Sequence, residues 1–170
     1  MAGELIGGTI DSLVSVMGTQ AEPVVGVSLR GLTFAHTGTT FLKRYMVPGP
    51  GDWSLHDNAA VRLEGVASME ITECVFQDLG GNALLLAGYV AQSTIANNEF
   101  ARLGDSAIVA YGRSDGIDAT AGDYPQDNLV EANHIHDIGL VGKQTAGYFQ
   151  SIAGHNTVRR NVIYHGPRVG

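Results

Sequence analysis

The sequence is poor in several residue types, and each shortage excludes a class of protein. One cysteine, Cys74, is present among 170 residues, so no disulfide can form within the chain. No apolar run approaches the roughly 20 residues that span a bilayer, and the first residues include Glu4 and Asp11 instead of a basic stretch. We therefore expect no membrane partner, and no signal peptide within this sequence.

Basic residues are also scarce. The chain carries 10 lysines and arginines against 17 aspartates and glutamates, which gives a formal net charge of −7 and a pI near 5.2. Proteins that bind nucleic acid usually present a basic surface to the phosphates. The charge balance therefore argues against nucleic acid as a partner.

Glycine, in contrast, is abundant. The sequence contains 23 glycines, only 5 prolines and 7% aromatic residues, and it shows no long apolar stripe with helical spacing. This composition favours short strands joined by tight turns. A hydrophobic content of 44% is sufficient for one core, so we expect residues 1–170 to form a single all-β domain.

A short internal repeat predicts the architecture of this domain. Residues 60–65, 83–88 and 107–112 read AVRLEG, ALLLAG and AIVAYG, and each phrase ends in glycine. A second phrase, at 69–76 and 93–100, ends in phenylalanine. Two strand-like phrases that recur about every 24 residues are typical of a solenoid.

Further copies of both phrases extend the pattern, so we predict a solenoid of about five coils. Three longer segments interrupt it, at residues 35–58, 113–126 and 136–147. We call them the first, second and third excursions, and we expect them to project from the corners as loops, where binding groups tend to lie.

The alignment stays open beyond the third excursion. Residues 149–154 resemble the first phrase, which would match them with 107–112. Matching Ala146 with Ala107 instead would place Tyr148 and Gln150 on the outer face of the strand.

Alternation along the phrases predicts which side chains face the core. We expect one sheet to direct inward Val61, Leu63, Leu84, Leu86, Ile108 and Ala110, and another to direct inward Leu29, Ile71, Ile95, Val130 and Val158 together with the terminal Phe and Ile residues. A further column, made of Cys74, Asn98, Asn133 and Asn161, falls where the second phrase must bend. We predict that its asparagines stack as a ladder that bonds to the backbone at a corner.

These phrases resemble the right-handed parallel β-helix proteins of the pectin-lyase-like superfamily. The segments 31–36 (GLTFAH), 97–100 (NNEF) and 133–139 (NHIHDIG) are similar to the repeats of that family. The segments 51–54, 104–108, 142–145 and 165–168 look like the β-helix domain of proteins related to glycoside hydrolase family 141. The resemblance implies a carbohydrate-active protein that meets polysaccharide outside the cell or at its surface.

The resemblance also implies that the β-helix would continue beyond the Gly-Pro-Arg phrase at 166–168, whereas this sequence stops at Gly170. We therefore expect a partial domain. An uncapped solenoid end exposes backbone groups and apolar side chains, so we also expect self-association or a partner at the C-terminal end.

Glycoside cleavage needs two carboxyl groups roughly 5 to 10 Å apart, a spacing that neighbouring coils could supply. Asp105 precedes a predicted strand, and Asp115 or Asp118 of the second excursion is its expected partner. Two structural interpretations stay open: Asp105 caps a turn, and the acidic excursion is a solvated loop. A calcium site in that excursion is a further hypothesis, and otherwise we expect no cofactor.

Substrate contacts are expected from the excursions and the outer faces of the strands. Trp53 would either stack on a sugar ring or fill the small core of its own loop, and Lys143 and Gln144 would orient a hydroxyl or carboxylate. The complete set of candidates is Trp53, Tyr111, His136, Lys143, Gln144 and Gln150. His134 and His136 share an outward face, but no third ligand is evident, so we predict no metal site.

Two functions remain from the sequence. The first is a glycoside hydrolase-like enzyme with a carboxylate pair, and a polysaccharide lyase that uses Lys143 as base is its less favoured variant. The second is a non-catalytic β-helix that binds glycan or serves as an assembly unit.

Overall fold

The computed structural model describes residues 6–40, 42–46, 55–113 and 118–168. Within these residues every regular element is a strand, and no helix is present that could cross a membrane. Three parallel sheets contain seven, five and five strands, and a separate antiparallel pair joins β5 (Tyr45–Met46) to β6 (Leu55–His56). The all-β prediction is confirmed, and the parallel sheets are compatible with a β-helix.

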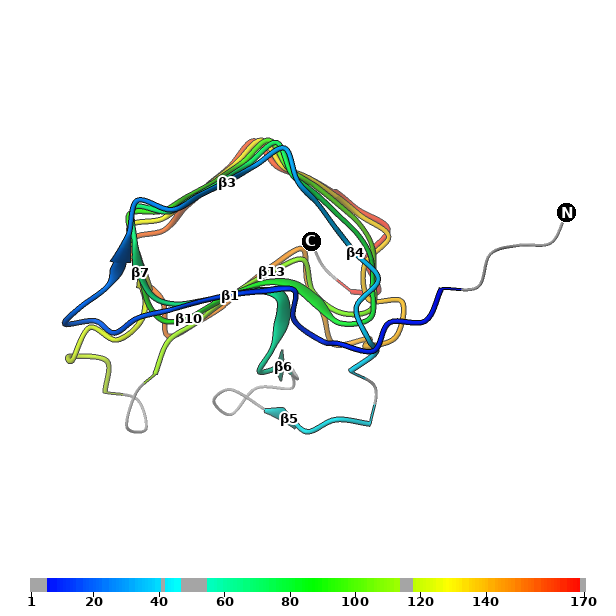
Figure 1. Cartoon of the computed structure of the whole chain (residues 1–170), viewed down its shortest axis with the longest axis horizontal. Helices are drawn as coiled ribbons and strands as arrows, with labels where there is room; N and C mark the ends of the chain where they lie inside the picture. Colours follow the sequence, from blue (N-terminus) through cyan, green and yellow to red (C-terminus); the bar gives the residue numbers. More distant parts are fainter. Residues whose placement is uncertain (1–5, 41, 47–54, 114–117, 169–170) are drawn as a thin grey trace, which may run out of the picture.

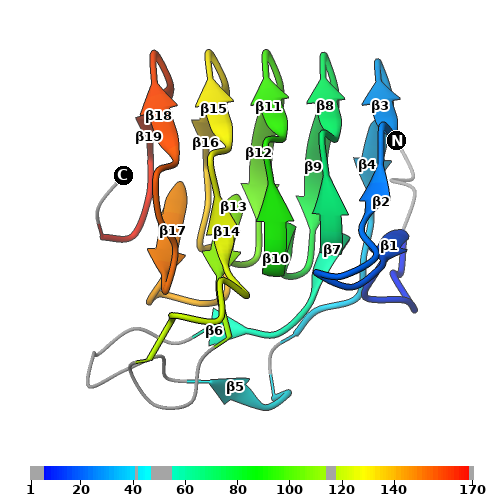
Figure 2. The ribbon, with the colours of Figure 1, turned by 90° about the vertical axis from the view of Figure 1, so that its left-hand side faces the viewer.

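The chain visits the three sheets repeatedly in the same order (Figures 1 and 2). The first sheet contains β1 (Val14–Met17), β2 (Val24–Val25), β7 (Ala59–Ala67), β10 (Asn82–Ala91), β13 (Ile108–Tyr111), β14 (Pro125–Gln126) and β17 (Tyr148–Ser151). The second sheet contains β3 (Ser28–Arg30), β8 (Glu70–Thr72), β11 (Thr94–Ala96), β15 (Leu129–Glu131) and β18 (Thr157–Arg159). The third sheet contains β4 (Thr33–Ala35), β9 (Val75–Leu79), β12 (Glu99–Leu103), β16 (His134–His136) and β19 (Val162–Tyr164).

The strand pairs follow the repeat seen in the sequence. Leu84 pairs with Val61 on one side and with Ile108 on the other, so the first phrases align. Phe100 pairs with Phe76 and with Ile135, across the second excursion. The second phrase, however, does not form one sheet, because it bends in the middle and contributes to both the second and the third sheet.

The core lies between the three sheets, as the alternation predicted. The inward aliphatic residues of the first sheet are fully buried, and so are Ile71, Ile95 and Val130 of the second. The rings of Phe34, Phe76 and Phe100 stack along the third sheet, with centroids 4.8 and 4.7 Å apart. Leu29 and Val158 occupy the expected columns on the outermost strands, where they are less covered.

The alignment at β17 differs from both sequence-based alternatives. Tyr148 pairs with Ile108 and Gln150 pairs with Ala110, so these two residues share the inward side of the first sheet. Matching residues 149–154 with 107–112 differs from the observed pairing by two residues, so it still assigns each side chain to the correct face of the strand. Matching Ala146 with Ala107 differs by one residue, so it assigns each side chain to the opposite face. The sequence pattern could not determine the register of β17, because the third excursion interrupts the repeat just before this strand and residues 149–154 match the first phrase poorly.

Asparagines form the predicted ladder at the corner between the second and third sheets. The Asn98 side-chain oxygen accepts a hydrogen bond from the Cys74 backbone N–H at 2.9 Å, and the Asn133 oxygen accepts from the Asn98 N–H at 3.0 Å. The Asn161 oxygen continues the series to the Asn133 N–H at 2.9 Å. The side-chain amides also donate to backbone carbonyls, such as Asn98 Nδ2 to Ile71 O at 2.9 Å.

A second ladder, which was not predicted from the sequence, occupies the corner between the first and second sheets. The Asn128 oxygen accepts from the Ser93 N–H at 2.9 Å, and the Asn156 oxygen accepts from the Asn128 N–H at 3.0 Å. Ser93 replaces asparagine in this column, and its hydroxyl accepts from the Met69 N–H at 3.1 Å. The serine concealed the pattern, because only two of the aligned positions are asparagine.

Replacing Asn98 with alanine tests the first ladder. The Asn98→Ala variant leaves the Cys74 N–H and the Ile71 carbonyl without their side-chain partners in the interior. We expect the free energy of unfolding to fall by about 2–4 kcal/mol, as measured by urea denaturation. Thr157→Ala, at an exposed position of β18, is the control and should change it by less than about 0.5 kcal/mol. Equal effects of the two substitutions would contradict the ladder's structural role.

Self-association stays a prediction, and β18 and β19 are where it would occur. Val158, Val162 and Tyr164 on these strands are 42%, 56% and 39% exposed. Apolar edge strands are prone to pair with another chain. Light scattering should therefore show a mass that rises with protein concentration, and a constant monomer mass at high concentration would refute the prediction.

Candidate functional site

Asp105, the first predicted catalytic residue, is buried at the corner between β12 and β13. The residue is 2% exposed. Its Oδ2 atom accepts hydrogen bonds from the Thr40 hydroxyl and the Tyr45 hydroxyl, each at 2.7 Å. Both donors belong to the first excursion, so the carboxylate attaches that excursion to the stacked sheets.

The third excursion closes the other side of Asp105. The Gly139 N–H donates to the Asp105 backbone carbonyl at 3.1 Å, and Gly142 lies so close that a β-carbon there would collide with Oδ1. Oδ1 itself is buried and has no hydrogen-bond partner among the described residues. The contacts of the Asp105 carboxylate show that it holds the first excursion against the corner, and the carboxylate does not face an open groove.

Burial also affects Tyr45, one of the donors to Asp105. Loss of water contact raises the pKa of the Tyr45 hydroxyl well above its ordinary value, the Thr40 hydroxyl lowers it, and the hydrogen bond to Asp105 raises it further. The phenol therefore stays protonated and remains a donor to the carboxylate.

Asp118, the described residue proposed as the partner of Asp105, lies beyond the opposite end of β13. Asp118 follows that strand, is exposed, and accepts a hydrogen bond from the Thr120 N–H at 2.9 Å. This backbone hydrogen bond lowers the pKa of the Asp118 carboxyl. The strand between them contains four residues and is about 13 Å long. Asp115 and Trp53 lie outside the described residues.

The predicted substrate contacts are distributed over different surfaces. Tyr111 packs on an outer cluster of the first sheet, and Gln150 accepts a hydrogen bond from the Tyr148 hydroxyl at 3.1 Å. Lys143 donates to the Gly139 carbonyl at 2.6 Å, and Gln144 accepts from Arg168. His136 lies on the third sheet. The structure therefore does not gather these five residues at one surface.

The outer face of the first sheet is partly covered by the chain itself. Leu55 of β6 is buried against Leu85, Ala87 and Val109, which point outward from the sheet. Figure 1 shows the β5–β6 pair below this sheet, with the second excursion beside it. These outward apolar residues thus form a second small core.

A larger pocket of about 470 Å³ lies beside the second excursion. It is lined by Asp118, Ala119, Thr120, Tyr124, Ile152, Ala153 and Gly154. Its wall combines one aromatic ring and aliphatic groups with a carboxylate and a hydroxyl, and its volume falls in the ordinary range for small-molecule sites. Of the predicted site residues that the structure describes, Asp118 lines it.

A smaller and more charged pocket of about 190 Å³ lies on the other side of the same excursion, and its lining includes Glu64, Tyr89, Arg113 and Asp123. Glu64 receives a hydrogen bond from Arg62 at 2.9 Å and forms an ion pair with Arg113. Burial acts to raise the Glu64 pKa, but the two arginines outweigh it and hold the pKa below its ordinary value. Glu64 is therefore an ionised acceptor and a poor proton donor.

Comparison with known proteins does not identify the chain. It matches no protein-family model, no curated protein and no solved structure. The resemblance to pectin-lyase-like proteins therefore rests on the phrases of the sequence, and the function has to be argued from the described surfaces.

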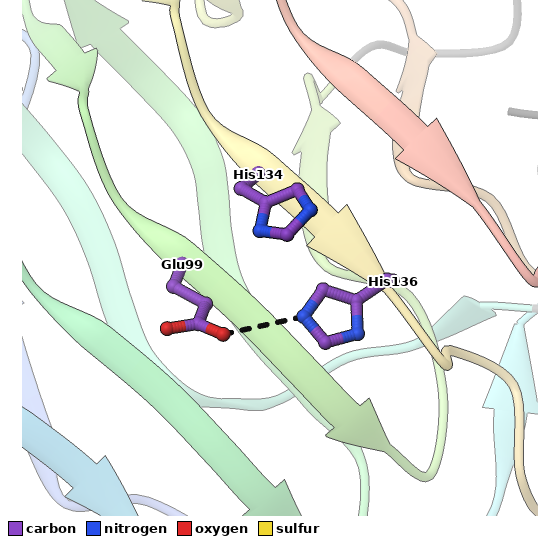
Figure 3. Close-up of side chains that lie close together, drawn as sticks. All are labelled: Glu99, His134 and His136. Atoms are coloured by element: carbon purple, nitrogen blue, oxygen red, sulfur yellow. Dashed lines mark hydrogen bonds and ion pairs between the residues drawn. The ribbon is translucent and has the colours of Figure 1, made fainter.

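A cluster of possible metal ligands lies on the outer face of the third sheet (Figure 3). Glu99, His134 and His136 each offer one ligand atom, and these atoms lie within 4.8 Å of one another. The histidine pair is evident in the sequence, whereas Glu99 becomes apparent only when Phe100 is matched with Ile135, which places Glu99 beside His134. A third ligand was not evident from the sequence because Glu99 comes from the neighbouring strand.

The calcium hypothesis for the second excursion stays a prediction. Its described carboxylates, Asp118 and Asp123, line different pockets. Within the described ranges, the group of three potential ligands is the one on the third sheet.

Asp105→Ala tests the anchoring role of this carboxylate. The substitution removes the acceptor of the buried Thr40 hydroxyl and the half-buried Tyr45 hydroxyl, so we expect the free energy of unfolding to fall by about 2–4 kcal/mol in urea denaturation. Asp118→Ala, at the exposed position, is the matched control and should change it by less than about 1 kcal/mol. An Asp105→Ala variant as stable as the parent protein would refute the anchor.

Glu64→Gln gives a pH-dependent test. Because the folded-state pKa of Glu64 lies below its unfolded value of about 4.3, its ionised form stabilises the fold fully above that pH. The contribution is lost as the pH falls through the folded-state pKa. We therefore expect Glu64→Gln to destabilise the protein by about 1–3 kcal/mol at neutral pH and by less near pH 3. Glu70→Gln, on an exposed strand position, is the control.

Proposed function

We propose that the protein binds glycan without cleaving it, and that the pocket beside the second excursion receives the sugar. The observation that carries the proposal is the combination of Tyr124 with Asp118 and Thr120 around a volume of about 470 Å³. Pyranose rings have apolar C–H faces and hydroxyl groups at the rim. An aromatic ring flanked by a carboxylate and a hydroxyl offers complementary contacts to both.

Binding is favoured over cleavage by the state of the carboxylates. Hydrolysis needs a protonated and an ionised carboxyl group on either side of one bond. Asp105 is enclosed by two excursions, and the pKa values of Asp118 and Glu64 are lowered, which is opposite to the shift that a general acid requires. These properties suit acceptors for sugar hydroxyls.

The charge distribution favours a neutral glycan. Asp118 lines the larger pocket, Glu64 and Asp123 line the smaller one, and the net charge is −7. Uronic acids would meet repulsion at this surface. We propose a neutral polysaccharide as the partner, encountered outside the cell or at its surface.

The proposed fold is a right-handed parallel β-helix of about five coils, similar to the pectin-lyase-like superfamily. Its support is the repeated order of three parallel sheets and the stacking of like residues along them. The family-like phrases supply the remaining support, including the NHIHDIG segment at 133–139.

Affinity electrophoresis through gels that contain neutral or uronic-acid polysaccharides tests the proposal. We expect retardation in at least one neutral polysaccharide, and roughly fivefold weaker binding by Tyr124→Ala, because a stacked ring contributes about 1 kcal/mol. Tyr124→Phe keeps the ring and should retain most of the affinity. Tyr164→Ala, on the third sheet, is the control and should bind like the parent protein.

Two outcomes would overturn the proposal. The first is that no polysaccharide of the panel retards the protein, in which case a role as an assembly unit would be the remaining non-catalytic function. The second is the release of reducing ends or unsaturated products from any polysaccharide, with their loss in Asp105→Asn, which would restore the hydrolase or lyase interpretation.

A further inference from the structure

The third sheet carries a polar outer surface that the glycan proposal does not use. Glu99 on β12 and His134 on β16 are paired residues of adjacent parallel strands, and His136 lies two residues further along β16. Side chains two residues apart share one face of a strand. The register therefore places all three on the outward face, as Figure 3 shows.

The spacing of the three side chains is close to that of a metal site. The His136 Nε2 atom lies 3.3 Å from the Glu99 Oε1 atom, and the three ligand atoms are within 4.8 Å of one another. Tetrahedral zinc, with bonds of about 2.0–2.2 Å, holds neighbouring ligands about 3.3–3.6 Å apart. The His136–Glu99 edge already has this length, and a rotation of the exposed His134 ring would bring in the third ligand.

Neighbouring side chains fix the orientation of His136. The Asp137 Oδ2 atom lies 2.8 Å from His136 Nδ1, so this nitrogen carries the hydrogen and Nε2 is directed to Glu99. The other carboxylate oxygen of Asp137 is 3.1 Å from His165 Nδ1, and the Tyr164 ring stacks on His136 with planes 7° apart. A carboxylate behind a ligating histidine is the usual outer-shell arrangement in metal proteins.

We propose that Glu99, His134 and His136 bind one divalent transition-metal ion of the zinc type. Two imidazoles and one carboxylate suit zinc and its neighbours, whereas calcium and magnesium prefer ligand sets made of oxygen. Because Glu99 and His134 are exposed, the remaining coordination position faces solvent, where a water molecule or an oxygen of a substrate would bind.

Titration of the metal-free protein with zinc chloride, followed by calorimetry, tests this site directly. We expect saturable binding of one zinc ion per chain, and an increase in the unfolding temperature at saturation. Cobalt(II) should occupy the same site and develop the visible absorption of a low-coordinate complex. Excess calcium should displace neither ion.

Single substitutions separate the site from weak surface binding. His134→Ala, His136→Ala and Glu99→Gln should each abolish the stoichiometric binding and the thermal shift. Asp137→Asn should weaken zinc affinity about 10- to 100-fold while the stoichiometry stays at one. His155→Ala, an exposed histidine beside Asp127 and away from the cluster, is the matched control and should leave affinity unchanged.

The proposal would be overturned if the parent protein showed no saturable zinc binding, or if Glu99→Gln and His136→Ala bound zinc with unchanged affinity. Both variants change partly or fully exposed positions, and circular dichroism would verify that they fold. The experiment uses no sugar, so its outcome is independent of the glycan proposal.

Discussion

The stacked sheets depend on hydrogen bonds that asparagine side chains make to backbone N–H and carbonyl groups at the corners. At the bend between the second and third sheets the chain adopts a left-handed conformation, at Gly31, Glu73, Asn97, Ala132 and Arg160. This conformation is costly for residues other than glycine, and it turns a backbone N–H away from ordinary strand pairing. The asparagine that follows the bend in neighbouring strands accepts that N–H and donates to a carbonyl, so one side chain replaces two missing contacts.

This constraint separates the residues that build the scaffold from those that are free to act. Inward positions are occupied by aliphatic and aromatic columns, and corner positions by the amide ladders. Variation is left to the outward faces and the excursions. Both described pockets flank the second excursion, and the histidine cluster lies on an outward face. The candidate functional residues therefore lie outside the core columns and the corner ladders that stabilise the fold.

The acidic residues show how the same chemical group takes different roles in different surroundings. Asp105 is enclosed and anchors the first excursion, Glu64 is held ionised by two arginines, and Asp118 is an exposed acceptor beside a pocket. Asp137 orients a histidine. The roles of these four carboxylates cannot be assigned from their neighbours in the sequence, because burial and partners from distant segments decide what each one does.

The sequence by itself determined the all-β class, the period of the strands, the inward columns and one of the asparagine ladders, because each follows from local alternation and a repeat of about 24 residues. Tertiary structure alone decided the rest. It divided the second phrase between two sheets, set the alignment at β17 and enclosed Asp105 with segments 60 residues or more before it and more than 30 after it. It also placed Glu99 beside His134 across an intervening excursion, because contacts between strands are made by register and not by distance along the chain.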